Sequence, residues 1–140
     1  MIKFLKTHPD AVLPTKNNSN DSEYDMTAVE DTVIPARGSA VVPVGLTLAD
    51  LQQGYWIRIE SRSGMAFKFG VTAFNGIIDN AYRGDLGVKL FNHTDVDYTV
   101  AKGNRVAQLV IYPLVNGEAV WSDTVTETVR GDKGFGSSGK

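Results

Sequence analysis

The chain has 140 residues, the length of one ordinary domain, and we expect a single domain with a moderate core. A net charge of -2 gives no general attraction for nucleic acid, so any polyanion must bind at a local site. The lack of cysteine excludes disulfides, thiolate nucleophiles and cysteine-based metal sites, and the wide separation of His8 and His93 argues against a zinc enzyme.

No apolar run approaches the length that crosses a bilayer, and residues 1–10 lack an apolar signal segment. We therefore expect no membrane association. The expected location is the cytoplasm, or the host cytoplasm if the chain is viral.

Short apolar and β-branched segments, separated by turn residues, follow one another along the chain, and each is expected to form a strand. No long window keeps a period near 3.6, so the fold class expected is all-β, a sandwich or barrel. The expected strands are 40–48, 55–60, 69–74, 86–91, 97–100 and 106–112.

The first candidate for a functional site is Asp25. It follows the Asn- and Ser-rich segment 15–22, which is expected to be unstructured. A lone carboxylate can bind a hydrated cation, since Mg²⁺ keeps several waters. The segment 61–64, Ser-Arg-Ser-Gly, follows an expected strand and could cradle a phosphate, although an ordinary polar turn is the alternative.

The Asn75-Gly76 pair indicates a hairpin between 71–74 and 77–79, because both residues tolerate positive φ. Asp79 would then lie just past the hairpin tip, three residues before Tyr82. A carboxylate there could activate water. The alternative is an ordinary exposed ion pair between Asp79 and Arg83.

The last two candidates are a strand and the C-terminal tail. Arg105 and Gln108 are three positions apart and would lie on opposite faces of a regular strand. The tail 130–139 combines a guanidinium, four glycines, two hydroxyls and an aromatic ring, which together suit a nucleotide. From composition alone, a flexible tail is the alternative.

Taken in order, these segments resemble the five motifs of the trimeric dUTPase family. The resemblance covers residues 22–139 and rests on Tyr-Asp, Arg-Ser-Gly, Ile-Asp-x-x-Tyr-Arg-Gly, Arg-Val-Ala-Gln-Leu-Val and Gly-Phe-Gly-Ser. It implies a distorted jelly-roll protomer of the β-clip type and a homotrimer whose three active sites are each built from all three chains. It also implies a dUTPase-like β domain over 1–129 and a flexible arm over 130–140.

The resemblance implies hydrolysis of dUTP to dUMP and pyrophosphate, with Mg²⁺ as cofactor. Asp79 would deprotonate the water that attacks the α-phosphorus, and Asp25 would hold Mg²⁺ through a coordinated water. Gln108 would fix a phosphate or the attacking water. The residues with phosphate or arm contacts would be Arg62, Ser63, Gly64, Arg130, Gly136, Ser137 and Ser138.

Selectivity, on the same resemblance, would come from the backbone around Asn75, Gly76 and Ile78, which would pair with the uracil edge. Tyr82 would pack under the deoxyribose and exclude a 2′-hydroxyl, and Phe135 would stack on the uracil.

Two positions depart from the family pattern. Ser22-Glu23 replaces Ala-Gly, so Glu23 would be strained if that glycine has positive φ. Lys133 stands where a glycine is common, and it could add a phosphate contact.

Two other functions stay open from the sequence alone. One is an enzyme related to dCTP deaminase, against which the Phe-Gly-Ser tail argues. The other is a regulatory trimer that binds a nucleotide without turnover, against which Asp79 argues.

Overall fold

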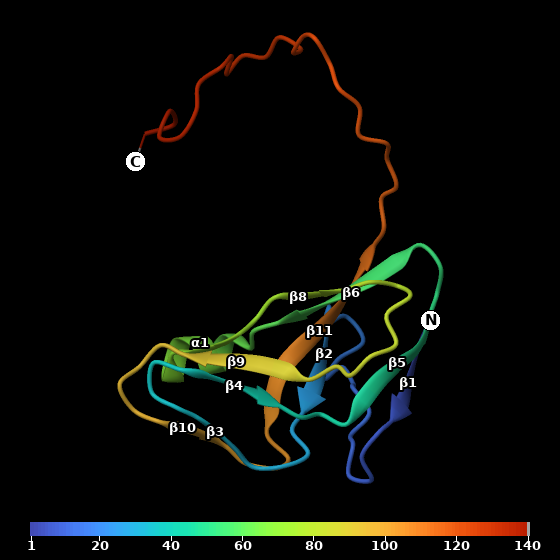
Figure 1. The fold of residues 1–140 in the computed structure, drawn as a ribbon, viewed down its shortest axis with the longest axis vertical. Helices are drawn as coiled ribbons and strands as arrows, with labels where there is room; N and C mark the ends of the chain where they lie inside the picture. Colours follow the sequence, from blue (N-terminus) through green and yellow to red (C-terminus); the bar gives the residue numbers. More distant parts are fainter. Residues whose placement is uncertain (140) are drawn as a thin grey trace.

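The computed structural model describes residues 1–139 as two main antiparallel sheets with two smaller strand pairs at their margins (Figure 1). The four-stranded sheet has the order β2 (Glu23–Thr27), β11 (Arg105–Pro113), β6 (Tyr55–Glu60) and β8 (Gly76–Ile78). The three-stranded sheet has the order β4 (Ser39–Val42), β9 (Val88–Asn92) and β7 (Val71–Ala73). The pairs are β1 (Ile2–Lys6) with β5 (Leu46–Leu51), and β10 (Tyr98–Val100) with β3 (Thr32–Ile34).

The core is formed by aliphatic side chains that alternate along the strands. On β6, Ile57 and Ile59 are buried while their neighbours are partly exposed, and on β9 Val88 and Leu90 follow the same period of two. This alternation is the reason the sequence folds as sheets with one apolar face each. The largest fully buried side chains are Met26, Ile34, Leu48, Leu51, Ile57, Leu86, Leu90 and Leu109.

The expected all-β class is confirmed, and the strand expected at 55–60 has the predicted bounds. The strand expected at 40–48 is wrong, because it is two strands that belong to different sheet pairs. Pro43 has no N–H for a ladder, and Gly45 has φ 65°, so the chain turns between β4 and β5. A Cβ at Gly45 would lie 2.5 Å from the Cβ of His8, so the turn also needs a glycine for space.

The sequence pattern missed one helix, α1 (Ser63–Phe69). Its seven residues are too few to establish a period of 3.6, and it ends at Gly70, which has the left-handed φ of 64° common at helix C-termini. Phe69, expected in a strand, is therefore the last residue of α1, and strand β7 begins at Val71.

The hairpin expected at Asn75-Gly76 is also wrong. Strand β7 pairs with β9 and strand β8 pairs with β6, so the flanking segments belong to different sheets. Neither residue has positive φ, and the N–H of Gly76 donates to the carbonyl oxygen of Phe74 at 2.9 Å. This three-residue hydrogen bond is that of an inverse γ-turn, and it carries the chain from one sheet to the other.

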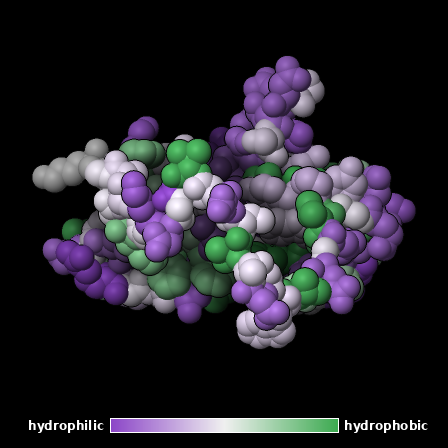
Figure 2. All heavy atoms as spheres, turned by 90° about the horizontal axis from the view of Figure 1, so that it is seen from above, coloured by the Kyte–Doolittle hydropathy of each residue, from purple (hydrophilic) through white to green (hydrophobic). Residues whose placement is uncertain are grey.

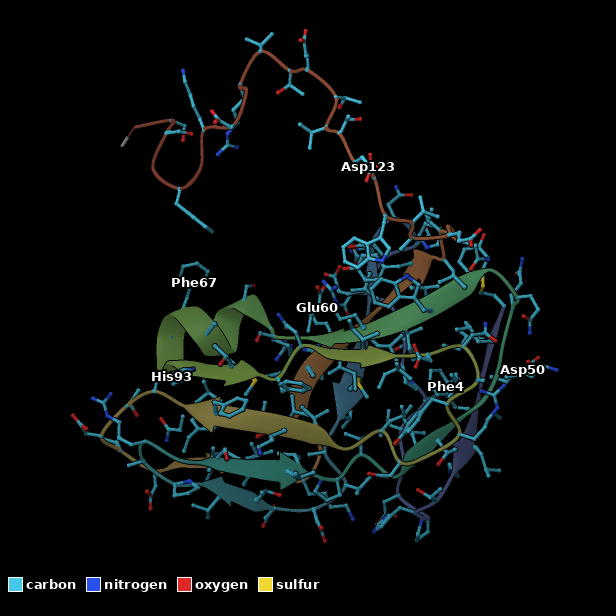
Figure 3. All side chains as sticks on the ribbon, turned by 45° about the horizontal axis from the view of Figure 1, so that its top comes forward. Phe4, Asp50, Glu60, Phe67, His93 and Asp123 are labelled. Atoms are coloured by element: carbon cyan, nitrogen blue, oxygen red, sulfur yellow. The ribbon has the colours of Figure 1, made fainter. Side chains whose placement is uncertain are left out.

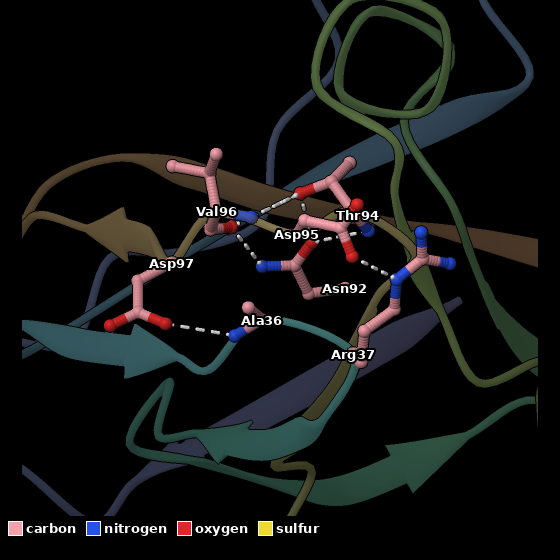
Figure 4. A network of polar contacts seen from close by, with 7 residues as sticks. All are labelled: Ala36, Arg37, Asn92, Thr94, Asp95, Val96 and Asp97. Carbon is pink, nitrogen blue, oxygen red and sulfur yellow. Dashed lines mark hydrogen bonds and ion pairs between the residues drawn. The ribbon is translucent and has the colours of Figure 1, made fainter.

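A buried asparagine fixes the loop that joins β9 to β10 (Figure 4). Asn92 is 3% exposed, and its amide donates to the carbonyl oxygens of Ile34 at 3.0 Å and Val96 at 2.8 Å. Its side-chain oxygen accepts from the N–H of Thr94 at 3.0 Å and from the hydroxyl of Thr94 at 2.8 Å. All four hydrogen-bonding capacities of the amide group are engaged, which makes its burial tolerable.

The segment 15–22, expected to be unstructured, contains no helix or strand, although Thr15 bridges to Asp25. After Pro113 the chain leaves the body, and residues 114–139 form a long arm that contains neither helix nor strand (Figure 1). The irregular segment thus begins earlier than the arm expected at 130–140, of which Lys140 lies outside the described residues. Most of the face seen in Figure 2 is hydrophilic, with hydrophobic residues scattered over it. Within residues 1–139, no helix combines the length and the apolar character that crossing a membrane requires.

Candidate active site

Strand β8 and the loop after it line a cavity of about 530 Å³, called here the β8 cavity. Strand β8 is an edge strand of its sheet, so one row of its backbone N–H and carbonyl groups has no strand partner among the described residues. The cavity brings together five residues that were expected to contact the nucleotide, namely Asn75, Gly76, Ile78, Asp79 and Tyr82. It is also lined by Ile59, Phe74, Ile77, Asp85, Gly87 and Lys89.

The loop from Asp79 to Asp85 is held by its own hydrogen bonds. The N–H of Tyr82 donates to the carbonyl of Asp79 at 3.0 Å, and the hydroxyl of Tyr82 donates to the carbonyl of Asp85 at 2.8 Å. The guanidinium of Arg83 donates to the carbonyls of Asn80 at 2.7 Å and Tyr82 at 2.9 Å. Arg83 therefore supports the loop backbone and forms no ion pair with Asp79 within residues 1–139.

A second polar centre surrounds Asp25, whose side chain is 12% exposed. Nη1 of Arg105 lies 3.1 Å from Oδ2 of Asp25, and Nε of Arg62 lies 3.8 Å from Oδ1. Arg62 also donates from Nη1 to the carbonyl of Arg105 at 3.2 Å, while its buried Nε has no hydrogen-bond acceptor among the described residues. Two guanidinium groups thus converge on one carboxylate.

Arg105 and Gln108 both adjoin Asp25, which corrects the expectation that they lie on opposite faces. The pairing of β11 with β2 shifts register between Arg105 and Ala107, so one extra residue interrupts the alternation of side chains. Gln108 is the direct register partner of Asp25, and Arg105 reaches the same carboxylate from beyond the bulge. The spacing of three could not predict this, because a bulge is invisible to simple alternation.

Glu23 lies on the same strand as Asp25 and is not strained. It is in β2, and its φ is not positive, so the glycine of the family pattern is not needed for backbone conformation here. Its Oε1 lies 3.4 Å from Nε2 of Gln108, and its Oε2 accepts from the hydroxyl of Ser22 at 2.7 Å.

The start of α1 and the loop before β11 line another cavity, of about 470 Å³, called here the arginine cavity. It includes Arg62 and Gly64 of the expected phosphate segment, and Ser63 lies between them as the first residue of α1. Its further lining residues are Met65, Lys68, Phe69, Tyr98, Gly103, Asn104 and Arg105. The arginine cavity and the β8 cavity share no lining residue.

A polar and aromatic cluster lies on the outer face of β6 and β11. The rings of Trp56 and Tyr112 stack at 4.8 Å between centroids, and the guanidinium of Arg58 lies over both rings. The hydroxyl of Tyr112 donates to Glu60 at 3.1 Å, and Glu60 also lies 3.7 Å from Arg58. Partial burial of the ring and then the Glu60 carboxylate raise the pKa of Tyr112 above its usual value.

Among residues 1–139, no group of three or more histidine and acidic side chains is arranged to hold a metal ion. A metal held by the described residues would therefore have fewer than three acidic or histidine ligands, and oxygens from a ligand and water would have to supply the rest. Asp25 is the carboxylate that lies beside the phosphate-binding candidates.

Comparison with known proteins decides which family these features belong to. A family model described as dUTPase matches residues 10–139. The chain belongs to the dUTPase family.

Two relatives show how far this dUTPase similarity extends. The deoxyuridine 5′-triphosphate nucleotidohydrolase of Arabidopsis thaliana is 44% identical over 138 residues, which cover 99% of this chain and 82% of that protein. The protein of the same name from Wolinella succinogenes is 40% identical over 141 residues, covering 99% of this chain and 94% of that protein. The predictions of the family and of a dUTP-hydrolysing enzyme are confirmed.

Solved structures of dUTPases share the fold. The dUTPase of Staphylococcus bacteriophage 80alpha with dUPNHPP has a TM-score of 0.92 and 27% sequence identity, and the match covers 100% of this chain and 99% of that chain. The expected jelly-roll protomer of the dUTPase type is thereby confirmed, and the family match favours hydrolysis over the deaminase alternative.

The dUTPase arm keeps its expected contact residues away from both cavities. Arg130 donates from Nε to the carbonyl of Lys133 at 2.9 Å and from Nη2 to that of Gly134 at 3.0 Å. Phe135 is fully exposed. All the arm residues expected at the nucleotide are exposed, and none of them lines the β8 cavity or the arginine cavity. These residues are Arg130, Phe135, Gly136, Ser137 and Ser138.

Several cavity residues were missed from the sequence. Phe74 offered a signal, since an exposed aromatic side chain directly precedes the Asn75-Gly76 pair. Lys89 and Tyr98 offered none, because only the pairing of β9 and β10 with distant strands brings them to the cavities.

Proposed function

We propose that this dUTPase hydrolyses dUTP to dUMP and pyrophosphate in the β8 cavity, with Asp79 as the general base. The observation that carries the proposal is the grouping of an unpaired strand edge, a fixed tyrosine ring and a carboxylate around one cavity. The strand edge corresponds to the base, the tyrosine ring to the sugar and the carboxylate to the attacking water, and all three lie within residues 75–82.

The uracil would be read by the free edge of β8. The carbonyl of Gly76 and the backbone N–H and carbonyl of Ile78 can pair with the donors and acceptors of uracil, whereas cytosine presents the opposite pattern at position 4; the N–H of Gly76 is already bonded to Phe74. A base whose pattern does not match leaves buried polar atoms unpaired, which discriminates strongly. The γ-turn at Asn75 supports this interpretation, because it directs the chain out of the sheet of β7, so that among the described strands β8 pairs only with β6.

The deoxyribose would rest on Tyr82. Its hydroxyl is committed to the carbonyl of Asp85, so the ring cannot easily swing away to admit a 2′-hydroxyl. This fixed ring would exclude UTP by steric hindrance.

Asp79 would take a proton from water as the water oxygen attacks the α-phosphorus. A bond forms between that oxygen and phosphorus, and the bond from the α-phosphorus to the oxygen bridging to the β-phosphate breaks. Pyrophosphate leaves with the electron pair of that bond. Most of the rate in such a transfer comes from positioning and charge stabilisation.

The triphosphate would bind the arginine cavity and the residues beside it. The Nε group of Arg62 without an acceptor supports an anionic ligand, with Ser63, Gly64 and Gln108 as further donors. Asp25 fits a role in holding Mg²⁺ through water, because Mg²⁺ takes oxygen ligands and one carboxylate suffices when phosphates and water supply the rest. When bound, Mg²⁺ would neutralise charge on the leaving pyrophosphate.

We further propose a homotrimer with shared sites. In one chain the β8 cavity and the arginine cavity have no residue in common, so a neighbouring chain is a natural source for the second half of each site. The arm would also close over the nucleotide at a neighbouring chain. The arm residues that would contact the nucleotide are Arg130, Phe135, Gly136, Ser137 and Ser138. The exposed large apolar side chains of the arm are Leu114, Val115, Val120, Trp121, Val125, Val129 and Phe135.

The decisive experiment measures pyrophosphate release from dUTP, dCTP, dTTP and UTP with Mg²⁺. A strong preference for dUTP is the expected result. Chelation of Mg²⁺ should abolish pyrophosphate release. Asp79→Asn should abolish turnover while dUTP still binds. No turnover of any nucleotide would favour the regulatory trimer instead.

Sedimentation at micromolar concentration tests the trimer, and a fully active monomer would contradict shared sites. The division into 1–129 and 130–140 and the cytoplasmic location stay predictions.

A further inference from the structure

Asn80 ties the loop after β8 to a distant turn. Its Nδ2 atom lies 2.9 Å from the carbonyl oxygen of Tyr55, 3.0 Å from that of Gln52 and 3.3 Å from that of Leu51. An amide nitrogen carries two hydrogens, so the longest contact shares one of them. Its Oδ1 in turn accepts from Nε2 of Gln53 at 3.4 Å. One side chain thus binds the whole turn between β5 and β6.

This anchor stands directly beside Asp79. Strand β8 ends at Ile78, so Asp79 is the first residue beyond the support of the sheet ladder, and Asn80 is the next. The backbone on either side is also engaged, since the carbonyl of Asp79 accepts from Tyr82 and the carbonyl of Asn80 accepts from Arg83. Asp79 is therefore held between the end of β8 and the amide of Asn80.

The side chain of Asn80 does not touch the β8 cavity. It lines an adjoining and mainly apolar cavity of about 440 Å³ with Trp56, Ala81 and Leu114, and this cavity shares Ile77 and Asp79 with the β8 cavity. The polar atoms of the Asn80 side chain are all engaged by the β5–β6 turn, which favours a role through Asp79 over direct contact with substrate.

We propose that Asn80 is a positioning residue that sets the carboxylate of Asp79 by anchoring its backbone to the β5–β6 turn. The inference rests on the proposed role of Asp79 as general base. Because a general base must reach one water in line with phosphorus, a displacement of about 1 Å lowers the rate by about 100-fold. Binding of base and phosphates depends on other groups and is not affected by such a displacement.

The test compares Asn80→Ala and Asn80→Asp with the unmodified chain. Asn80→Asp keeps the shape but turns a carboxylate oxygen toward three carbonyl oxygens, so it removes both donors. Asn80→Ser keeps one shorter donor and serves as the second variant if Asn80→Asp does not fold. The matched control is Asn20→Ala, an exposed asparagine in the irregular segment before β2.

For each variant, kcat and KM for dUTP are measured together with the Kd and the stoichiometry of dUPNHPP binding. The expected result for Asn80→Ala is a kcat reduced about 10- to 100-fold, with KM, Kd and sites per chain within about twofold of the unmodified chain. Asn80→Ser should fall between Asn80→Ala and the unmodified chain. The stoichiometry separates displacement of Asp79 from loss of folded protein.

A kcat for Asn80→Ala within about twofold of the unmodified chain would overturn the inference, as would a loss of kcat matched by an equal loss of binding sites. A different result would show that the proposed function itself is wrong: the unmodified chain would not hydrolyse dUTP, or Asp79→Asn would remain fully active.

Discussion

The hydroxyl of Tyr82 occupies the space that a side chain at Gly84 would need. A Cβ atom at Gly84 would lie 2.4 Å from the hydroxyl oxygen and 2.6 Å from the ring carbon that bears it. The glycine therefore permits the ring position that the bond from Tyr82 to Asp85 maintains.

Gly84→Ala should displace the ring of Tyr82 and weaken sugar discrimination. Once the added methyl group breaks the bond to Asp85, the partly exposed ring of the variant can rotate into solvent, so the free energy of unfolding should change by no more than about 1 kcal/mol. The ratio of kcat/KM for dUTP over UTP should fall by about 10-fold or more, since the steric barrier is lost. Gly117→Ala, where a Cβ would meet no atom within 4 Å, is the control. An unchanged ratio would show that Tyr82 does not exclude the ribose.

Arg105→Met should destabilise the protein more than Arg37→Met. Arg105 pairs with Asp25, whose side chain is 12% exposed, whereas Arg37 pairs with Asp95 at a shorter distance on the open surface. Loss of the closest partner of a partly buried carboxylate lowers the free energy of unfolding by about 1–3 kcal/mol. Loss of an exposed ion pair lowers it by less than about 1 kcal/mol. Urea denaturation of both variants measures the difference. An equal loss of unfolding free energy in the two variants would mean that the burial of Asp25 does not strengthen its ion pair with Arg105.

Phe74→Ala should raise KM for dUTP and leave kcat unchanged. The ring lines the β8 cavity and lies beside Gly76, with its Cδ1 atom 3.8 Å from the position of a Cβ there. An aromatic contact with a base contributes about 0.5–1.5 kcal/mol, which corresponds to about 2- to 10-fold in KM. The control is Phe67→Ala, because Phe67 points from α1 into solvent (Figure 3) and does not line the cavity. The same rise in both variants would contradict a specific role for Phe74.

Removal of the chain from Arg130 onward should lower kcat/KM by about 100-fold or more without unfolding the body. Residues 130–139, the described part of the removed segment, are exposed and add no side chain to the core, so the free energy of unfolding should stay within about 0.5 kcal/mol. Turnover and urea denaturation are measured on the same preparation. Full activity after truncation would eliminate the arm from the site.

Glu60→Gln should lower the pKa of Tyr112 toward the ordinary value of 10.0. Partial burial, the largest cause of the raised pKa, remains in the variant, and a glutamine oxygen can still accept from the phenol, while the negative charge of Glu60 is lost. Because the folded-state pKa lies above the unfolded value, the associated stabilisation is complete below pH 10.0 and is lost as pH rises through the folded pKa. Absorbance titration of tyrosinate, with Tyr112→Phe as reference, measures the shift. A rise in pKa would refute the assignment.

The sequence by itself determined the all-β class and the identity of the motif residues. Alternation of apolar residues defined β6 to the residue, because side chains of a strand with one buried face must repeat every two positions. The segments Tyr-Asp, Arg-Ser-Gly and Ile-Asp-x-x-Tyr indicated the dUTPase family, since phosphate and base contacts need particular side chains at particular spacings.

Only the tertiary structure decided how these residues meet. Local turn chemistry at Asn75-Gly76 predicted a hairpin, but β7 and β8 pair with strands of two different sheets, and this long-range pairing outweighs a two-residue preference. The bulge that brings Arg105 to Asp25 depends on the partner strand β2. The anchor at Asn80 depends on a turn more than twenty residues away, and contacts between such distant segments leave no periodic signal in the sequence because they are fixed by packing of the whole chain.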